Sequence, residues 1–370
     1  MVQRLEVPGH VLQHFWDLAN VEAEVRRRSA VDLVSELATA QSNHAEGGGA
    51  SATARDDATS ELGPSLRACS PVVVYALKRL ARGLGSGRSG ARQGFALALT
   101  AAFSEIPIAS LDDGLQLLKS SLEPITQSTK GSEARDILMG QLFGVAALVR
   151  AMRARLATGT MTAEDAEAFG AVVAEETSAL ATSKAYLAES AAAVILELSH
   201  ALGEGDENAN NDNAKSNASM TRVIEASSAL TKWLTTPIAD AGPETILLAL
   251  ELWPALPPSV RANCAALPRG VDPVAVGGSG DGKKGGKKGG KGGGKEKESA
   301  SHVAAVFDRE HLSAVRDALM EASYTHPQMH SVWAWFLSRV ASVPGGLEAT
   351  WDVLVEDGLL VSGSHQRRYL

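Results

Sequence analysis

The amino-acid sequence predicts an all-α fold, and three observations support this prediction. Hydrophobic residues make up 45% of the 370 residues but aromatic residues only 5%, with alanine, leucine and valine dominant, so intrinsic preference favours helices over strands. Apolar side chains recur at helical spacing over stretches of helix length. Corners that contain proline separate these stretches, as in stacked helical hairpins of the armadillo or HEAT type. Because no fixed period is visible, an irregular helical bundle stays open as the alternative.

Three loop-like segments divide the chain. Residues 41–63 are small and polar, residues 203–219 are acidic and rich in asparagine, and residues 277–301 are rich in lysine and glycine. Such compositions bury too little apolar surface to offset the entropy of ordering, so we expect a flexible first loop and disordered second and third loops. The segments between them are expected to be helical: 1–40, 64–202, 220–276 and 302–370.

Residues 75–100 form the first distinctive element. Leu77, Leu80 and Leu84 fall on one helical face, and Phe95 and Leu99 repeat the spacing after a glycine-rich turn, so we expect two antiparallel helices.

The glycines of that turn spell G-x-G-x-x-G at Gly85, Gly87 and Gly90. A dinucleotide-binding loop needs a strand in front of it, whereas here a helix is expected. No G-x-x-x-x-G-K-[ST] phosphate loop occurs in the chain either, so we expect no nucleotide cofactor.

Five basic residues on this element are candidate contacts to nucleic acid or to an acidic partner: Lys78, Arg79, Arg82, Arg88 and Arg92. No carboxylate lies near them in sequence. A solvated helix face with partners on a neighbouring helix would explain them, and so would a surface that attracts polyanions. Both interpretations stay open.

Local signals place the helices that follow. Ser110 and Asp113 form an N-terminal capping pattern, and Pro124 marks the end of that helix. The apolar positions within 132–155 predict a long buried helix, in which Gly140 and Gly144 allow close helix packing. Further helices are expected after Thr162 with Asp165, over 186–198 and over 223–234.

The third loop supplies a second set of candidate contacts: Lys283, Lys284, Lys287, Lys288 and Lys291. The net charge of the chain is −8, and residues 277–298 carry +4. The rest of the chain therefore carries −12. Overall acidity therefore does not exclude a local polyanion contact. A hydrated spacer is the alternative, because Gly-Lys runs stay solvated whether or not they bind.

The sequence lacks residues for catalysis or metal binding. No G-x-S-x-G elbow, kinase triplet or paired-carboxylate block for two magnesium ions occurs. His10 with His14, and His326 with His330, are spaced four apart but lack the further ligands that zinc needs. We therefore expect no enzyme, no metal and no small-molecule substrate.

Apolar stretch length, the N-terminal sequence and cysteine usage favour an intracellular protein. The longest apolar stretch, 137–149, is shorter than the about 20 residues of a membrane span, and the N-terminus does not resemble a signal peptide. Cys69 and Cys264 do not resemble a disulfide framework, which agrees with a reducing compartment.

Five segments, 15–19, 75–100, 140–151, 332–340 and 351–370, resemble, in this order, the N-terminal region of the DNA polymerase phi family. The resemblance implies an armadillo-type helical solenoid in the nucleus and nucleolus. It implies a non-catalytic protein that binds ribosomal DNA or transcription-related proteins and supports ribosomal RNA synthesis and ribosome biogenesis. RNA is a further candidate contact. Family members are much longer, so we expect this chain to be a fragment of a longer protein.

Two other functions stay open. The family name suggests a DNA-directed DNA polymerase. A karyopherin-like adaptor that holds basic peptides in a groove is also compatible with a solenoid, although the six tryptophans of the chain are not periodic.

Overall fold

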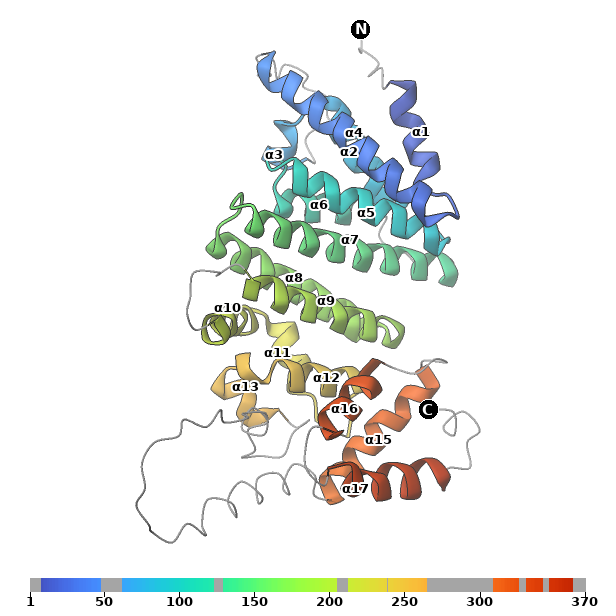
Figure 1. Cartoon of the computed structure of the whole chain (residues 1–370), viewed down its shortest axis with the longest axis vertical. Coiled ribbons are helices and arrows are strands. Elements are labelled where there is room, and N and C mark those ends of the chain that lie inside the picture. The colour runs from blue at the N-terminus through green and yellow to red at the C-terminus, as the bar shows by residue number, and fades with distance from the viewer. Residues whose placement is uncertain are drawn as a thin grey trace, which may run out of the picture. The chain divides into compact units, whose positions relative to one another are not determined.

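The computed structural model describes residues 8–47, 62–122, 129–204, 212–237, 239–264, 309–325, 331–341 and 346–361. Every regular element in these ranges is a helix, as Figure 1 shows, so the all-α prediction is confirmed. The elements are α1 (Gly9–Asp17), α2 (Ala23–Glu46), α3 (Pro64–Arg67), α4 (Pro71–Gly83), α5 (Ser89–Glu105), α6 (Leu111–Ser121), α7 (Gly131–Ala157), α8 (Ala163–Ser183), α9 (Ala185–Glu204), α10 (Asp212–Ala226), α11 (Ser228–Leu234), α12 (Pro243–Glu251), the 3-10 helix η2 (Trp253–Ala255), α13 (Pro258–Asn263), α15 (Arg309–Thr325), α16 (Ser331–Ala341), α17 (Gly346–Thr350) and the π-helix η4 (Trp351–Leu360).

The chain forms two compact units. Unit 1 comprises residues 1–173 and 197–219, and unit 2 comprises residues 174–196 and 220–370. Helices α8, α9 and α10 contribute residues to both units.

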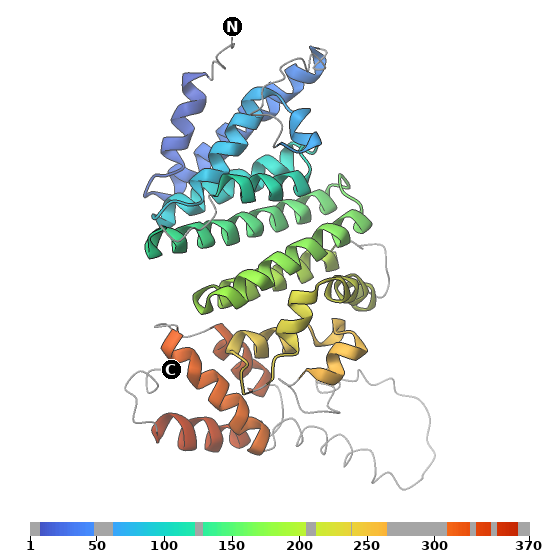
Figure 2. The ribbon, with the colours of Figure 1, turned by 180° about the vertical axis from the view of Figure 1, so that it is seen from behind.

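The helices of unit 1 are stacked as a helical solenoid. Helix α5 packs against α2, α4 and α7, and α6 packs against α4 and α7; Figure 2 shows these layers from behind. The core between them is apolar, with Leu99, Phe103, Leu148 and Met152 at most 1% exposed. Burial of a side chain of this size contributes about 1.5–3 kcal/mol. Whether the repeats are of armadillo or HEAT type stays a prediction.

Two glycines of α7 allow the close packing predicted for them. A Cβ on Gly140 would lie 2.8 Å from the carbonyl oxygen of Leu84, and a Cβ on Gly144 would lie 2.7 Å from the Leu118 side chain. Both distances are shorter than van der Waals contact, so only glycine lets α7 approach these neighbours.

Two helices, α7 and residues 185–203 of α9, are long and apolar enough to cross a membrane by length and composition alone. The most apolar window of α7 is 61% buried inside the protein, where side chains such as Leu142 and Val149 face unit 1. Helix α7 is therefore a core helix of unit 1.

The predicted helix starts at Ser110 and Thr162 are confirmed. The Ser110 hydroxyl accepts a hydrogen bond from the Asp113 backbone N–H at 3.1 Å, and the Thr162 hydroxyl accepts one from the Asp165 N–H at 3.1 Å. Each satisfies one of the unpaired donors of a first helical turn. Helix α6 ends at Ser121, and Pro124 lies outside the described residues.

The helix predicted over 223–234 is interrupted at Ser227, so this prediction was wrong in one detail. The Ser227 hydroxyl accepts a hydrogen bond from the Leu230 N–H at 3.2 Å and starts α11. The Glu175 carboxylate of α8 accepts hydrogen bonds from the Ser227 and Ser228 hydroxyls, both at 2.9 Å, and from the Ala229 N–H at 2.8 Å. These bonds satisfy the start of a new helix.

The structure also differs from the prediction at two loop boundaries. Helix α2 continues through Glu46, and its Gln41 side chain accepts a hydrogen bond from the Ser70 N–H at 2.8 Å. Helix α10 begins at Asp212, inside the second predicted loop, and the Ser219 hydroxyl donates to Glu167 at 2.7 Å. Most of the first loop, residues 205–211 and all of 277–301 lie outside the described residues.

Unit 2 is built around α12. This helix contacts α11, α15 and α16, and α15 in turn contacts η4. Leu248, Leu319 and Val332 are fully buried in its core. Arg261 supports the 3-10 helix that follows α12, because its guanidinium lies 5.0 Å from the Trp253 ring centroid and donates to the Trp253 carbonyl oxygen at 2.9 Å.

Candidate polyanion-binding corner

The α4–α5 corner comprises α4, residues 84–88 and the first turn of α5. Pro71 stands at the first position of α4, and the Ser70 hydroxyl accepts a hydrogen bond from the Val73 N–H at 3.3 Å. Leu77 and Leu80 are buried at helical spacing, and Lys78 and Arg82 lie on other faces of α4, half-buried and exposed respectively.

A helix, and not a strand, precedes the glycine-rich turn, as predicted. The turn continues α4 with backbone hydrogen bonds from Gly85 N–H to the Arg82 carbonyl at 3.2 Å and from Ser86 N–H to the Gly83 carbonyl at 3.1 Å. A Cβ on Gly87 would lie 3.1 Å from the Asp136 carboxylate of α7. The turn is therefore a helix corner packed on α7, which agrees with the rejection of a dinucleotide-binding loop.

Arg79 is a structural residue of this corner. Its guanidinium lies 4.7 Å from the centroid of the Phe15 ring and donates to the Tyr75 hydroxyl at 2.8 Å. The rings of Phe15 and Tyr75 meet edge to face at 6.4 Å between centroids. Arg79 therefore joins α4 to α1 through cation–π and hydrogen-bond contacts.

Arg92 is also held inside unit 1. Its side chain is 11% exposed, forms an ion pair with Asp136 at 3.1 Å and donates to the Ser86 carbonyl oxygen. The guanidinium lies 6.0 Å from the centroid of the Phe143 ring. For this residue the partner comes from a neighbouring helix, which was the structural alternative.

Lys78, Arg82 and Arg88 remain as free cations. Lys78 is half-buried, and Arg82 and Arg88 are exposed. Within the described ranges none of the three side chains has a hydrogen bond or an ion pair. Their positive charge is available to a phosphate or a carboxylate of a partner.

Sequence reasoning missed a sixth basic residue, Arg26 of α2, which lies beside this corner. Its guanidinium donates to the Asn20 and Val21 carbonyl oxygens at 2.9 and 2.7 Å and to the Gln93 side chain of α5 at 3.2 Å. A Cβ on Gly90 would lie 3.5 Å from the same guanidinium. The run of three arginines at 26–28 was the available signal, but only packing brings it to α5.

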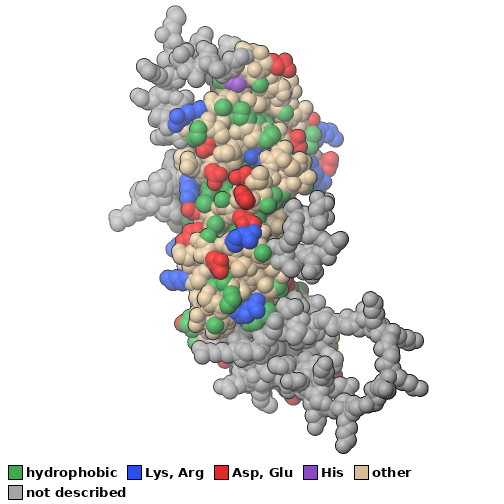
Figure 3. All heavy atoms as spheres, turned by 90° about the vertical axis from the view of Figure 1, so that its left-hand side faces the viewer, with side chains coloured by type: hydrophobic (Ala, Val, Ile, Leu, Met, Phe, Trp, Pro, Cys, Tyr) green, Lys and Arg blue, Asp and Glu red, His purple; other side chains and the backbone are tan. Residues whose placement is uncertain are grey.

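The structure does not describe the lysine candidates of the third loop or the second histidine pair. The five lysines of the third loop, and His326 with His330, lie outside the described residues. On the face seen in Figure 3, basic and acidic side chains are interspersed among apolar ones.

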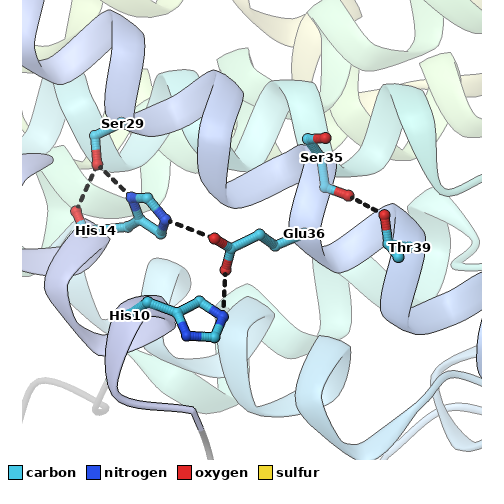
Figure 4. A network of polar contacts seen from close by, with 6 residues as sticks. All are labelled: His10, His14, Ser29, Ser35, Glu36 and Thr39. Carbon is cyan, nitrogen blue, oxygen red and sulfur yellow. Dashed lines mark hydrogen bonds and ion pairs between the residues drawn. The ribbon is translucent and has the colours of Figure 1, made fainter.

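His10 and His14 share one carboxylate, as Figure 4 shows. Their Nε2 atoms lie 3.3 and 3.2 Å from the two oxygens of Glu36, and the Ser29 hydroxyl lies 3.3 Å from His14 Nδ1. This network joins α1 to α2. Among the described residues, no group of three or more His, Cys, Asp and Glu side chains is arranged to hold a metal ion.

Both cysteines are buried free thiols. Burial, and the nearby Asp113 charge, raise the pKa of Cys69 to about 11. The thiol is therefore protonated at neutral pH and is a poor nucleophile.

Comparisons with known proteins converge on one family. The family model described as DNA polymerase phi matches residues 75–262, a range that begins at the α4–α5 corner. Myb-binding protein 1A of Mus musculus is 32% identical over 152 residues, and Myb-binding protein 1A-like protein of Danio rerio is 29% identical over 142 residues. The matches cover 40% and 38% of this chain but only 9% of each relative. No solved structure matches.

Proposed function

The chain belongs to the DNA polymerase phi family, and on that premise we propose that it is a non-catalytic scaffold of the nucleus and nucleolus. Its helical surface binds DNA, including ribosomal DNA, together with transcription-related proteins, and so supports ribosomal RNA synthesis and ribosome biogenesis. The observation that carries the nucleic-acid part is the set of three unpaired cations, Lys78, Arg82 and Arg88, on one corner of the matched region.

The contact is expected to be electrostatic and independent of base sequence. Lysine and arginine side chains on a helix surface neutralise phosphates and release counterions, so affinity falls as salt rises. The five lysines of the third loop supply further charge of the same kind. Arg79 and Arg92 support this surface by fixing α4 and α5 to their neighbours, and they are not expected to touch phosphate.

The protein partner is proposed to be a transcription factor. Both relatives carry Myb-binding in their names, and this property is stated of those proteins. A solenoid offers a continuous helical surface for such a partner.

The non-catalytic part of the proposal is supported by the sequence. Nucleotidyl transfer uses carboxylates that hold two metal ions, and the chain has no paired-carboxylate motif of that type. Primer extension with purified protein and magnesium tests this part, and the expected result is no incorporation above buffer. Incorporation that is lost on replacing a single carboxylate of this chain would overturn it.

A fluorescence-anisotropy titration tests the nucleic-acid contact. The double variant Arg82→Glu/Arg88→Glu is compared with Lys184→Glu/Lys232→Glu, which changes the net charge equally at exposed lysines elsewhere. We expect about tenfold weaker binding to a duplex DNA oligonucleotide for the corner variant, and a salt slope lower by about 2. An equal loss in both variants, or no binding by the natural protein at low salt, would contradict a contact at this corner.

A further inference from the structure

The C-terminal helix of unit 2 exposes a row of apolar side chains. Leu347 in α17 is 52% exposed, and Trp351 and Leu360 in η4 are 57% and 69% exposed. Val355 between them is half-buried. We refer to Leu347, Trp351, Val355 and Leu360 as the α17–η4 stripe.

Helix geometry places these four residues on one side. Leu347 and Trp351 are four residues apart at the end of an α-helix, where such pairs share a face. The π-helix closes i→i+5 hydrogen bonds and has more than four residues per turn. Trp351, Val355 and Leu360 follow at spacings of four and five, so η4 continues the same face.

The opposite side of the helix is already packed. Val353 and Leu354 are each 2% exposed. Gly358 faces α15, where an added Cβ would lie 3.0 Å from Arg316 Cδ and 3.2 Å from Met320 Cε. The helix therefore has two apolar sides, and unit 2 covers only one of them among the described residues.

Acidic residues flank the exposed side. Residues 346–361 contain four acids and no lysine or arginine. Glu348, Asp352 and Glu356 are exposed, and none of them has an ion pair within the described ranges. An exposed apolar row with a charged rim is typical of a protein-binding surface, and the rim has a single sign.

We propose that the α17–η4 stripe docks an amphipathic helix of another protein, with apolar residues on one face and lysine or arginine beside it. The apolar face covers Trp351 and Leu360, and the basic flank pairs with Asp352 and Glu356. Helix-on-helix docking of this kind uses anchors at helical spacing, and a cation beside Trp351 gains a cation–π contact.

Two other candidate partners for the α17–η4 stripe fit less well. The basic segment 277–298 of this chain contains no hydrophobic residue, so it cannot cover an apolar row. A second copy of the chain would place like acidic rims against each other, which costs binding energy.

The test measures binding of a fluorescent helix-forming peptide of leucine and lysine to the full chain. A peptide of the same composition, reordered so that its leucines form no stripe, is the peptide control. We expect the ordered peptide to bind more tightly. Trp351→Ser/Leu360→Ser should weaken binding about tenfold or more, and Asp352→Lys/Glu356→Lys should weaken it about as much and remove much of its salt dependence.

Matched protein variants distinguish binding at the stripe from non-specific hydrophobic binding and from an effect of net charge. Trp16→Ser/Val21→Ser removes apolar side chains that are 71% and 90% exposed in unit 1, and Asp32→Lys/Glu46→Lys makes the same charge change at exposed acids of α2. Both should bind the peptide like the natural protein. Equal binding of the two peptides, or equal effects of stripe and control variants, would overturn the proposal.

Three further measurements complete the test. Circular dichroism should show unchanged unfolding of the stripe variants, because their side chains are exposed. Light scattering after size exclusion should show the same mass for natural and stripe-variant protein. A dimer that Trp351→Ser/Leu360→Ser dissociates would identify a second copy as the occupant and overturn the proposal. DNA binding should be unaffected by Trp351→Ser/Leu360→Ser, which changes no charge, so the two proposals fail independently.

Discussion

The α4–α5 corner of unit 1 and the α17–η4 stripe of unit 2 use charged and apolar residues in opposite ways. At the corner, Arg79 and Arg92 turn inward and contact an aromatic ring, a hydroxyl, a carboxylate and a backbone carbonyl. At the stripe, Trp351 and Leu360 turn outward although they are apolar. Composition alone therefore does not tell which side chains face a partner.

Unit 1 owes much of its organisation to charged groups that satisfy the backbone. Arg155 of α7 is 5% exposed and donates to the carbonyl oxygens of Phe103 and Ala109, both at 2.7 Å, and of Ile106 at 3.2 Å. These carbonyls lie at and beyond the end of α5, where no intrahelical donor is available. Burial lowers the pKa of Arg155, but an arginine stays charged at neutral pH.

Replacing Arg155 should have the largest effect on unit 1. Arg155→Met keeps an unbranched apolar chain but removes the donor of the Phe103 and Ala109 carbonyl oxygens, while the Ile106 oxygen keeps the Ala109 N–H at 3.1 Å. We therefore expect a loss of about 3 kcal/mol in the free energy of unfolding. Urea unfolding followed by circular dichroism measures it. Arg28→Met, at an exposed arginine of α2, should change stability by less than about 0.5 kcal/mol. Similar losses in both variants would show that Arg155 does not stabilise the chain at the C-terminal end of α5.

Replacing Gly94 should cause the next largest loss of stability. A Cβ on Gly94 would lie 2.0 Å from the Leu18 carbonyl oxygen, so Gly94→Ala must displace the turn between α1 and α2. A clash with a backbone atom falls in the upper part of the overpacking range, about 2–3 kcal/mol, and the better helix propensity of alanine returns about 1, which gives a net loss of about 1–2 kcal/mol. Gly90→Ala, whose Cβ has 3.5 Å to its nearest neighbour, should be neutral or stabilising in the same thermal unfolding experiment. Equal melting temperatures for the two variants would contradict the close approach.

Replacing Glu175 in unit 2 should cause the smallest loss of stability, and this loss depends on pH. Hydrogen bonds from the Ala229 N–H and the Ser227 and Ser228 hydroxyls lower the pKa of Glu175 from its ordinary value of 4.5. A carboxylate with a lowered pKa stabilises the fold fully above its unfolded pKa, and this contribution is lost as the pH falls through the folded pKa. Glu175→Gln should therefore destabilise the protein at pH 7. At pH 3 the destabilisation should be much smaller.

Urea titrations at these two pH values measure the difference. Thr182→Ala, at an exposed residue of the same helix without an ionisable group, should change stability equally at both pH values. A stability difference for Glu175→Gln that is the same at both pH values would mean that the ionised carboxylate does not support α11.

Local sequence patterns predicted the helices well where the signal lies within one turn. Ser110 and Thr162 start α6 and α8 because a hydroxyl and the N–H three residues later are both local. The break at Ser227 was not predictable in this way, because Glu175 lies 52 residues earlier in the chain. Arg26 was missed at the candidate site for the same reason, since its contact to Gln93 spans 67 residues.

Composition, periodicity and capping patterns by themselves determined that this protein is all-α, where α6 and α8 begin, and that its glycine-rich turn joins two helices. They determined this because helical period and capping act between residues a few positions apart. Only the tertiary structure decided which of the five basic residues at the corner stay free and which apolar residues of α17 and η4 face outward. Those outcomes depend on ion pairs and packing between helices far apart in the chain, which no local pattern contains.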